Sequence, residues 1–106
     1  MTQEINAVDA AKLREGDSNV VFLDVREDEE LAICRIEGAL HISMGTIPEK
    51  FEQLPRDKTL IVLCHHGMRS MNVVHYLEAQ GFQNAVNLSG GIHAWSVFVD
   101  PEMAQY

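Results

Sequence analysis

The sequence has few features of a membrane, secreted or nucleic-acid-binding protein. Its longest unbroken apolar run covers five residues, at 60–64, whereas a membrane-spanning helix needs about 20. The first residues have neither the basic start nor the apolar stretch of a secretory signal. Bases are scarce, since eight Lys and Arg face sixteen Asp and Glu, and the net charge of -8 opposes binding to a phosphate backbone. We therefore expect a cytoplasmic protein whose partners are neither membranes nor nucleic acids.

Cysteine is also scarce. Cys34 and Cys64 are the two in the chain, too few for a disulfide framework. His65 and His66 follow Cys64 directly, but adjacent residues rarely close a tetrahedral zinc site, and no Cys-x2-Cys or His-x3-His spacing supports one. The sequence therefore predicts no metal site, and each cysteine is interpreted by itself.

The composition is that of one folded domain. Apolar residues make up 46% of the 106 residues and charged residues 23%, which is close to the average for globular proteins. Neither a repeat nor a Pro/Gly/Ser-rich linker divides the chain. We expect residues 1–106 to form a single domain with one hydrophobic core.

Short apolar runs alternate with helical patterns along the chain. Continuous aliphatic runs at 20–25 and 60–63 are typical of strands covered on both faces in a parallel sheet. Further strands are expected at Ile5, 39–42 and 85–88, and helices at 6–16, 27–34, 46–53, 70–80 and from 91 onward. Apolar residues recur at helical spacing in three of these helices: Val8, Ala11 and Leu13; Val73, Val74 and Leu77; Ile92, Trp95 and Phe98. This alternation predicts an α/β fold with a five-stranded, mostly parallel sheet and helices on both faces.

Chemistry is expected where the most apolar strand, 60–63, ends in Cys64 and the best-defined helix begins. Ligands of such folds bind at the carboxyl ends of the strands. Gly67 permits a tight loop, the helix amino terminus adds partial positive charge, and Arg69 adds a full charge. These features predict a lowered pKa for the Cys64 thiol. A cysteine at the end of an apolar strand can equally be a small buried hydrophobe, so the functional interpretation requires a side chain that is not sealed beneath its neighbours.

At this loop the sequence resembles the rhodanese sulfurtransferases. The segment 64–70 is similar to their active-site loop. Three further segments follow the family's order: 23–27 resembles its Asp-Val-Arg segment, 36–42 its Gly-Ala turn, and 90–95 its closing Gly-Gly-x-x-x-Trp. The resemblance spans 20–98 and implies the rhodanese fold.

The resemblance also implies a reaction. Cys64 would take a sulfane sulfur from thiosulfate or a similar donor, carry it as a persulfide, and pass it to a thiophilic acceptor such as cyanide or a thiol. No metal or organic cofactor is implied; the partners are a small-molecule donor and acceptor, with a thiol-bearing protein as a further candidate. The substrate-binding residues would be those of the loop, namely His65, His66, Gly67, Met68, Arg69 and Ser70.

Two alternatives to this enzyme stay open. Phosphatases that resemble rhodaneses carry Cys-x5-Arg, whereas here Arg69 follows four residues after the cysteine and Ser70 occupies the next position. The shorter loop favours sulfur over phosphoryl transfer. The second alternative is a relay module that receives persulfide from another protein and turns over little thiosulfate. The presence of Cys64 does not distinguish this relay from an enzyme.

Other residues of interest have structural interpretations beside functional ones. Cys34 lies where relatives commonly have Gly-His-Ile-Pro; it could resolve a persulfide, but packing is favoured. Asp24 and Arg26 hold a neighbouring loop if the resemblance applies. The acidic run 27–30 is read as a solvated helix start in preference to a docking surface. His41, His75 and His93 are taken as structural or surface residues, and Trp95 as core.

Overall fold

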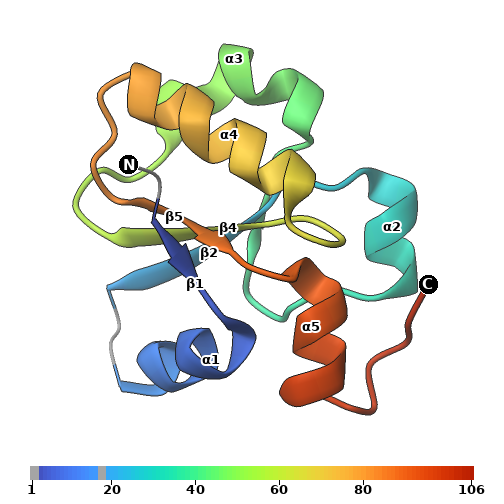
Figure 1. The fold of residues 1–106 in the computed structure, drawn as a ribbon. Coiled ribbons are helices and arrows are strands. Elements are labelled where there is room, and N and C mark those ends of the chain that lie inside the picture. The colour runs from blue at the N-terminus through green and yellow to red at the C-terminus, as the bar shows by residue number, and fades with distance from the viewer. Residues whose placement is uncertain (1–2, 17–18) are drawn as a thin grey trace.

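A sheet of five parallel strands forms the centre of the molecule (Figure 1). The computed structural model describes residues 3–16 and 19–106. The strands are β1 (Glu4–Ile5), β2 (Val20–Asp24), β3 (Leu40–His41), β4 (Thr59–Leu63) and β5 (Ala85–Leu88), in the order β1-β5-β4-β2-β3. The expected sheet is confirmed, and each pair of neighbouring strands is parallel.

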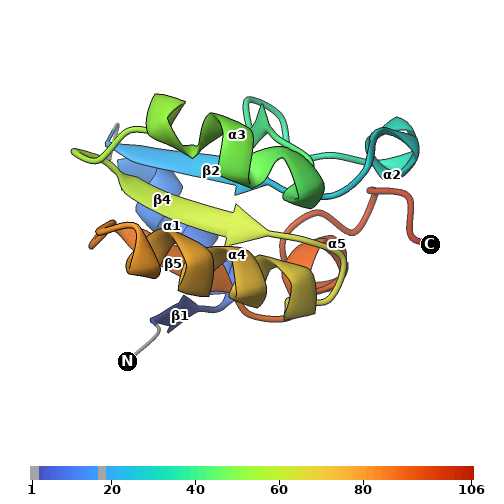
Figure 2. The same cartoon turned by 90° about the horizontal axis from the view of Figure 1, so that it is seen from above.

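Helices cover both faces of this sheet, as Figures 1 and 2 show. α1 (Ala7–Gly16) and α5 (Gly91–Phe98) lie on one face, and α3 (Ile47–Lys50) and α4 (Met68–Ala79) on the other. Short 3-10 turns at Met44–Thr46 and Phe51–Gln53 flank α3, and α2 (Asp28–Ile33) follows β2. None of the helices among the described residues has the length and apolar character needed to cross a membrane.

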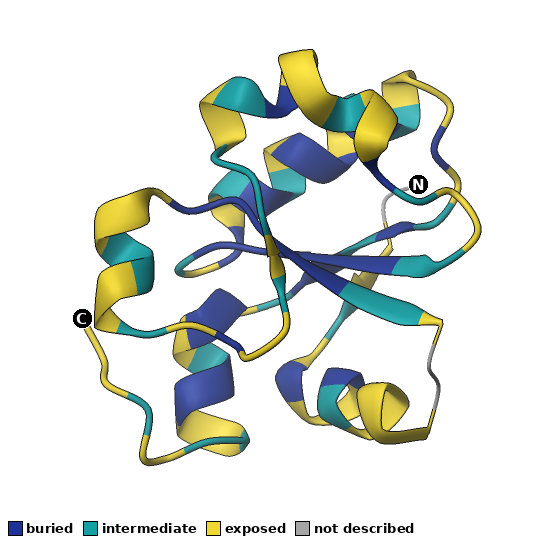
Figure 3. Cartoon of the chain, turned by 180° about the vertical axis from the view of Figure 1, so that it is seen from behind, coloured by how far each residue is buried: buried dark blue, intermediate teal, exposed yellow. Residues whose placement is uncertain are grey.

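The core consists of two apolar clusters separated by the sheet. Because successive side chains of a strand point to opposite faces, Leu60 and Val62 of β4 pack toward α4, whereas Ile61 and Leu63 pack toward α5. Both faces of β4 are therefore buried, as Figure 3 shows for the central strands. This double burial accounts for the continuous apolar run that predicted the strand.

The apolar faces of the helices match the sequence in α4 but differ in α1 and α5. Val73, Val74 and Leu77 of α4 are buried. In α1 the buried residues are Ala7 and Ala10, whereas Val8 and Leu13 are 40% and 37% exposed. Alanine at the contact lets α1 lie close to α5 and the sheet, which turns the larger side chains outward. In α5, Ile92 and Trp95 are buried but Phe98 is 68% exposed. The next residue, Val99, continues the buried face instead and packs against the core.

Candidate active site

Cys64 lies at the carboxyl end of β4, where the sequence places it. The chain turns at Gly67, whose positive φ of 109° only glycine adopts readily, and enters α4 at Met68. α4 therefore begins two residues earlier than expected, and Arg69 and Ser70 lie in its first turn. The loop is held between the central strand and the helix that covers it.

The Cys64 side chain is buried, with 1% of its surface exposed. The requirement that the sequence set, a side chain not sealed beneath its neighbours, is therefore not met in this conformation. The functional interpretation rests instead on the groups that contact the sulfur. The backbone N–H of Gly67 donates to Sγ at 3.1 Å, and the Ser70 hydroxyl lies 3.4 Å from it. An inert core cysteine has apolar neighbours on all sides, whereas this sulfur has polar donors directed at it.

The groups around the sulfur determine whether the pKa of the Cys64 thiol is shifted up or down. Burial raises the pKa of Cys64, but the Ser70 hydroxyl and the backbone N–H groups of Ser70, Gly67 and Arg69 lower it, and the net shift is downward from the ordinary value. Hydrogen bonds to an anion stabilise the charged form. The sulfur therefore has an environment that stabilises the thiolate more than the environment of an ordinary cysteine does.

Behind Ser70 lies Asn87 of β5, a residue that the sequence analysis did not single out. Asn87 points toward α4, is 1% exposed, and its Oδ1 lies 2.5 Å from the Ser70 hydroxyl. Its Nδ2 donates to the carbonyl of Gly67 at 3.2 Å and to Glu4 at 3.0 Å. A polar residue in an otherwise apolar buried strand was the available signal.

The amino terminus of α5 supports the loop from the other face of the sheet. The N–H of Ile92 donates to the carbonyl of Cys64 at 2.8 Å, and the N–H of His93 donates to that of His65 at 3.0 Å. Gly91 makes this approach possible, because a Cβ there would overlap both carbonyl oxygens. Gly91 of the Gly-Gly pair therefore allows the backbone of α5 to contact the backbone of the cysteine loop.

The outer rim of the loop is ionic. Arg69, expected to meet an oxyanion, forms a two-pronged ion pair with Glu30 of α2 at 2.7 and 2.8 Å. The Tyr106 hydroxyl donates to the same carboxylate at 2.6 Å and accepts from Arg26 at 3.0 Å. Figures 1 and 2 show the C-terminal segment beside α2. Glu30 and Tyr106 are functional candidates that local sequence patterns could not identify, since their positions are 39 and 37 residues away from Arg69.

Arg69 and Arg26 each form an ion pair with a carboxylate. The Glu30 carboxylate raises the pKa of Arg69, and Arg69 in turn holds the pKa of Glu30 well below its usual range. Arg26 is fully buried and paired with Asp24 at 2.8 Å. Its guanidinium also donates to the carbonyl of Cys34 at 2.8 Å. The expectation that Asp24 and Arg26 hold a neighbouring loop is confirmed.

Three imidazoles gather at the mouth of the loop. The ring of His65 stacks on Tyr106 with centroids 3.8 Å apart, and it lies 4.0 Å from the ring of His66. His93 joins them, at 5.2 Å from His66 and 6.3 Å from His65. Burial and the neighbouring His66 lower the pKa of His65. The structure therefore brings His93 to the site, although the sequence analysis treated it as structural or surface.

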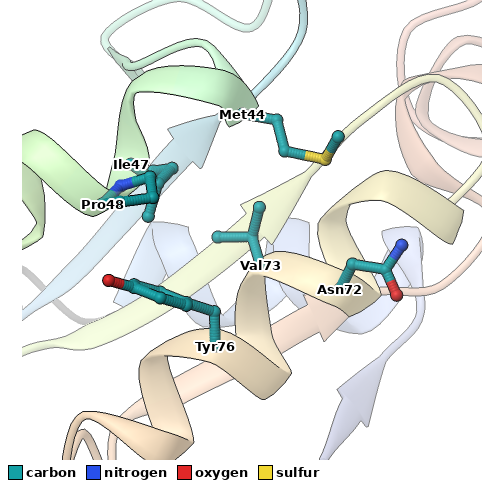
Figure 4. A pocket seen from close by; sticks show the side chains of 6 residues that line it. All are labelled: Met44, Ile47, Pro48, Asn72, Val73 and Tyr76. Atoms are coloured by element: carbon teal, nitrogen blue, oxygen red, sulfur yellow. The ribbon is translucent and has the colours of Figure 1, made fainter.

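Two hollows lie close to this region. One, of about 280 Å³, opens beside the loop and is lined by His66, Gly67, Met68 and Asn87 among others. Met68 is 78% exposed at its edge. The other, of about 170 Å³, lies between α3 and α4, where Asn72 and Tyr76 join four apolar residues in its lining (Figure 4). The first is the better candidate for a substrate site, because residues of the cysteine loop line it.

Neither a metal site nor a pair of cysteines forms within the described residues. No group of three or more His, Cys, Asp or Glu there has a metal-binding arrangement. Cys34 and Cys64 are both free thiols, and they pack in the clusters on opposite faces of the sheet. Cys34 accepts a weak contact from Arg26 at 3.9 Å, which agrees with the packing role favoured for it.

A parallel α/β domain with an activated cysteine at a strand end defines a class of cysteine-dependent transfer proteins. Comparison with known protein families shows which family within this class the chain belongs to. The family model described as "Rhodanese-like domain" matches residues 7–97. The chain belongs to the rhodanese-like domain family.

Known relatives agree with this assignment. The Bacillus subtilis protein named "Putative sulfurtransferase YtwF" is 47% identical, with 93% of this chain and 98% of that protein covered. The thiosulfate sulfurtransferase GlpE of Coxiella burnetii is 35% identical, covering 73% and 72%. The crystal structure of a rhodanese-like domain protein from Staphylococcus aureus has a TM-score of 0.83 and 37% identity, covering 89% and 91%. These relatives support sulfur transfer as the general class of reaction.

Proposed function

We propose that this protein transfers sulfane sulfur from thiosulfate or a similar donor to a nucleophilic acceptor, cyanide or a thiol, through a persulfide on Cys64. The observation that carries the proposal is the polar cradle of Cys64, in which the Gly67 N–H and the Ser70 hydroxyl face Sγ. A thiolate is the competent nucleophile in such chemistry. The relatives named as sulfurtransferases support the same reaction class.

The transfer has two half-reactions. In the first, the Cys64 thiolate attacks the outer sulfur of thiosulfate; the new S–S bond forms as the old one breaks, and sulfite leaves with the electron pair. In the second, the acceptor attacks the terminal sulfur of the persulfide, and Cys64 leaves as a thiolate. The loop N–H donors stabilise the anion at the start and the end of this cycle.

The loop residues have distinct roles in the proposal. Gly67 and Ser70 face the sulfur, while His66 and Met68 line the hollow through which a donor approaches. His65 forms the rim with Tyr106. Arg69 attracts the donor oxyanion, which competes with the Glu30 carboxylate for its guanidinium. Because Cys64 is buried, the rim must open for the donor to reach it.

One observation favours a second candidate, a relay that accepts sulfur from a protein persulfide. In the resting structure the positive charge of Arg69 is already neutralised by Glu30. A persulfide donor has less need of a free cation than the thiosulfate dianion has. The relay uses the same Cys64 persulfide and differs only in the donor.

The test is the loading of purified protein with a sulfane donor, followed by intact-mass measurement. Thiosulfate alone should add the mass of one sulfur atom to the parent and to Cys34→Ser, but not to Cys64→Ser. Loading only by a protein persulfide would select the relay. Absence of loading by either donor, or turnover of an aryl phosphate alone, would reject sulfur transfer.

A further inference from the structure

The Ser70 hydroxyl has one proton and two acceptors. Its oxygen lies 2.5 Å from Oδ1 of Asn87 and 3.4 Å from Sγ of Cys64. A hydroxyl donates a single hydrogen bond, so the proton can serve only one acceptor at a time. The shorter contact places it on Asn87 in this conformation.

The orientation of the Asn87 amide is fixed by its other partners. Its nitrogen contacts the carbonyl oxygen of Gly67 and a carboxylate oxygen of Glu4, at 3.2 and 3.0 Å. Both groups only accept hydrogen bonds, so they require the NH₂ end of the amide. The Oδ1 end must therefore face Ser70, and Asn87 presents an acceptor there.

The hydrogen bonds of Ser70 differ between the thiol and the thiolate forms of Cys64. While the Ser70 proton points to Asn87, the Ser70 oxygen offers a lone pair to Sγ and can accept from the S–H of a thiol. When the thiol loses its proton to solvent, Ser70 must rotate to donate to the thiolate. Oδ1 of Asn87 then loses its donor, although Asn87 is buried, and a buried acceptor without a partner costs free energy.

We propose that Asn87 is a positioning residue that acts through Ser70: it holds the Ser70 proton while Sγ is a thiol or the inner sulfur of a persulfide, and releases it when Sγ is a thiolate. The persulfide part rests on the proposed function; the thiol part does not. Ser70 would donate to Sγ at the two points where Sγ bears negative charge, namely attack and departure. Asn87 thereby limits how much thiolate the unloaded protein contains.

Few charged groups surround this Cys64–Ser70–Asn87 triad. Arg69 on α4 lies near the sulfur and is paired with Glu30 on α2. Glu4 on β1 contacts the far side of the Asn87 amide. The imidazoles of His65 and His66 stand at the mouth of the loop. None of them lies between Ser70 and Asn87, where the proton moves.

The proposal is tested by a double-mutant cycle in a Cys34→Ser background, with the rate of Cys64 alkylation by iodoacetamide measured against pH. Asn87→Ala should lower the apparent pKa of Cys64 by about half to one pH unit, because Ser70 becomes free to donate to sulfur. Ser70→Ala should raise it. In the Ser70→Ala background, Asn87→Ala should produce no downward shift.

Controls separate this role from a general loosening of the loop. Asn87→Asp keeps an acceptor for Ser70, loses the contact with Gly67 and adds a negative charge that disfavours the thiolate, so it should raise the pKa. If Asn87→Ala does not fold, Asn87→Ser withdraws the acceptor from Ser70 with a smaller loss of polarity. The proposal is overturned if the chosen variant leaves the pKa unchanged or raises it, or lowers it equally without Ser70. Alkylation needs no sulfane donor, so this outcome is independent of whether Cys64 accepts sulfur.

Discussion

The inner and outer sides of the cysteine loop are built in different ways. The inner side, formed by Cys64, Ser70 and Asn87, is buried and neutral, and it lies on adjacent strands and the helix between them. The outer rim, formed chiefly by Arg69, Glu30 and Tyr106, is partly exposed and ionic. The difference indicates a division of labour, in which the inner side controls the reactivity of the sulfur and the rim controls what reaches it.

The largest effect is expected from Gly91→Ala, which disturbs the contact between α5 and the cysteine loop. A Cβ would overlap the carbonyl oxygens of Cys64 and His65 at a residue with φ of 60°, so the unfolding free energy should fall by about 2 kcal/mol or more. Sulfur loading should fall with it. Gly45→Ala is the matched control, because nothing lies within 4 Å of its Cβ position. Equal stability of the two variants by denaturant unfolding would contradict the tight contact.

A smaller effect is expected from Arg69→Ala on the rim. Removing the guanidinium should slow loading from thiosulfate by about tenfold, the loss of one charge-assisted contact. Alkylation of Cys64 by neutral iodoacetamide should change much less. Comparing the two rates tests whether the rim selects by charge. A tenfold loss with both reagents would show that Arg69 acts on the sulfur itself, so that the rim and the inner side would not have separate roles.

The ion pair should also make stability depend on pH. Because Arg69 holds the pKa of Glu30 below its ordinary value of 4.5, folding favours the carboxylate. Its contribution is complete above that ordinary pKa and is lost as the pH falls below it. Thermal unfolding of the parent and Glu30→Gln should therefore differ near neutral pH and converge in acid. A difference that grows toward acid would reverse the assigned sign.

The smallest effect is expected from Tyr106→Ala. The change removes the ring that stacks on His65 and the hydroxyl shared with Glu30, so Cys64 should react about threefold faster with iodoacetamide at a pH where it is fully ionised. The apparent pKa of Cys64 should stay the same. Tyr106→Phe keeps the stack and is the matched control. A shift of the pKa as large as that of Ser70→Ala would show that rim and inner side are not separate.

Local patterns were sufficient where one segment determines the outcome. The run 60–63 predicted a buried strand, and the stripe of Val73, Val74 and Leu77 predicted the buried face of α4. Local patterns were insufficient for α1, because the packing of α1 against α5 and the sheet determines its buried face. Its alanines, which carry the weakest hydrophobic signal, make the contact.

The candidate site divides in the same way. Cys64, Gly67 and Arg69 are neighbours in the chain, and their spacing was enough to identify the loop. The spacing does not connect Asn87 or Tyr106 with the loop, because they reach it only after β5 pairs with β4 and the C-terminal segment reaches α2. The burial of Cys64 was missed for the same reason.

The sequence alone therefore determined the order of strands and helices, the α/β class and the location of the reactive loop, since each depends on residues a few positions apart. The contact of Ser70 with Asn87 and the cover that Tyr106 places over the loop depend on the tertiary structure. They join residues of different elements that are far apart in the chain, and side-chain spacing carries no information about them.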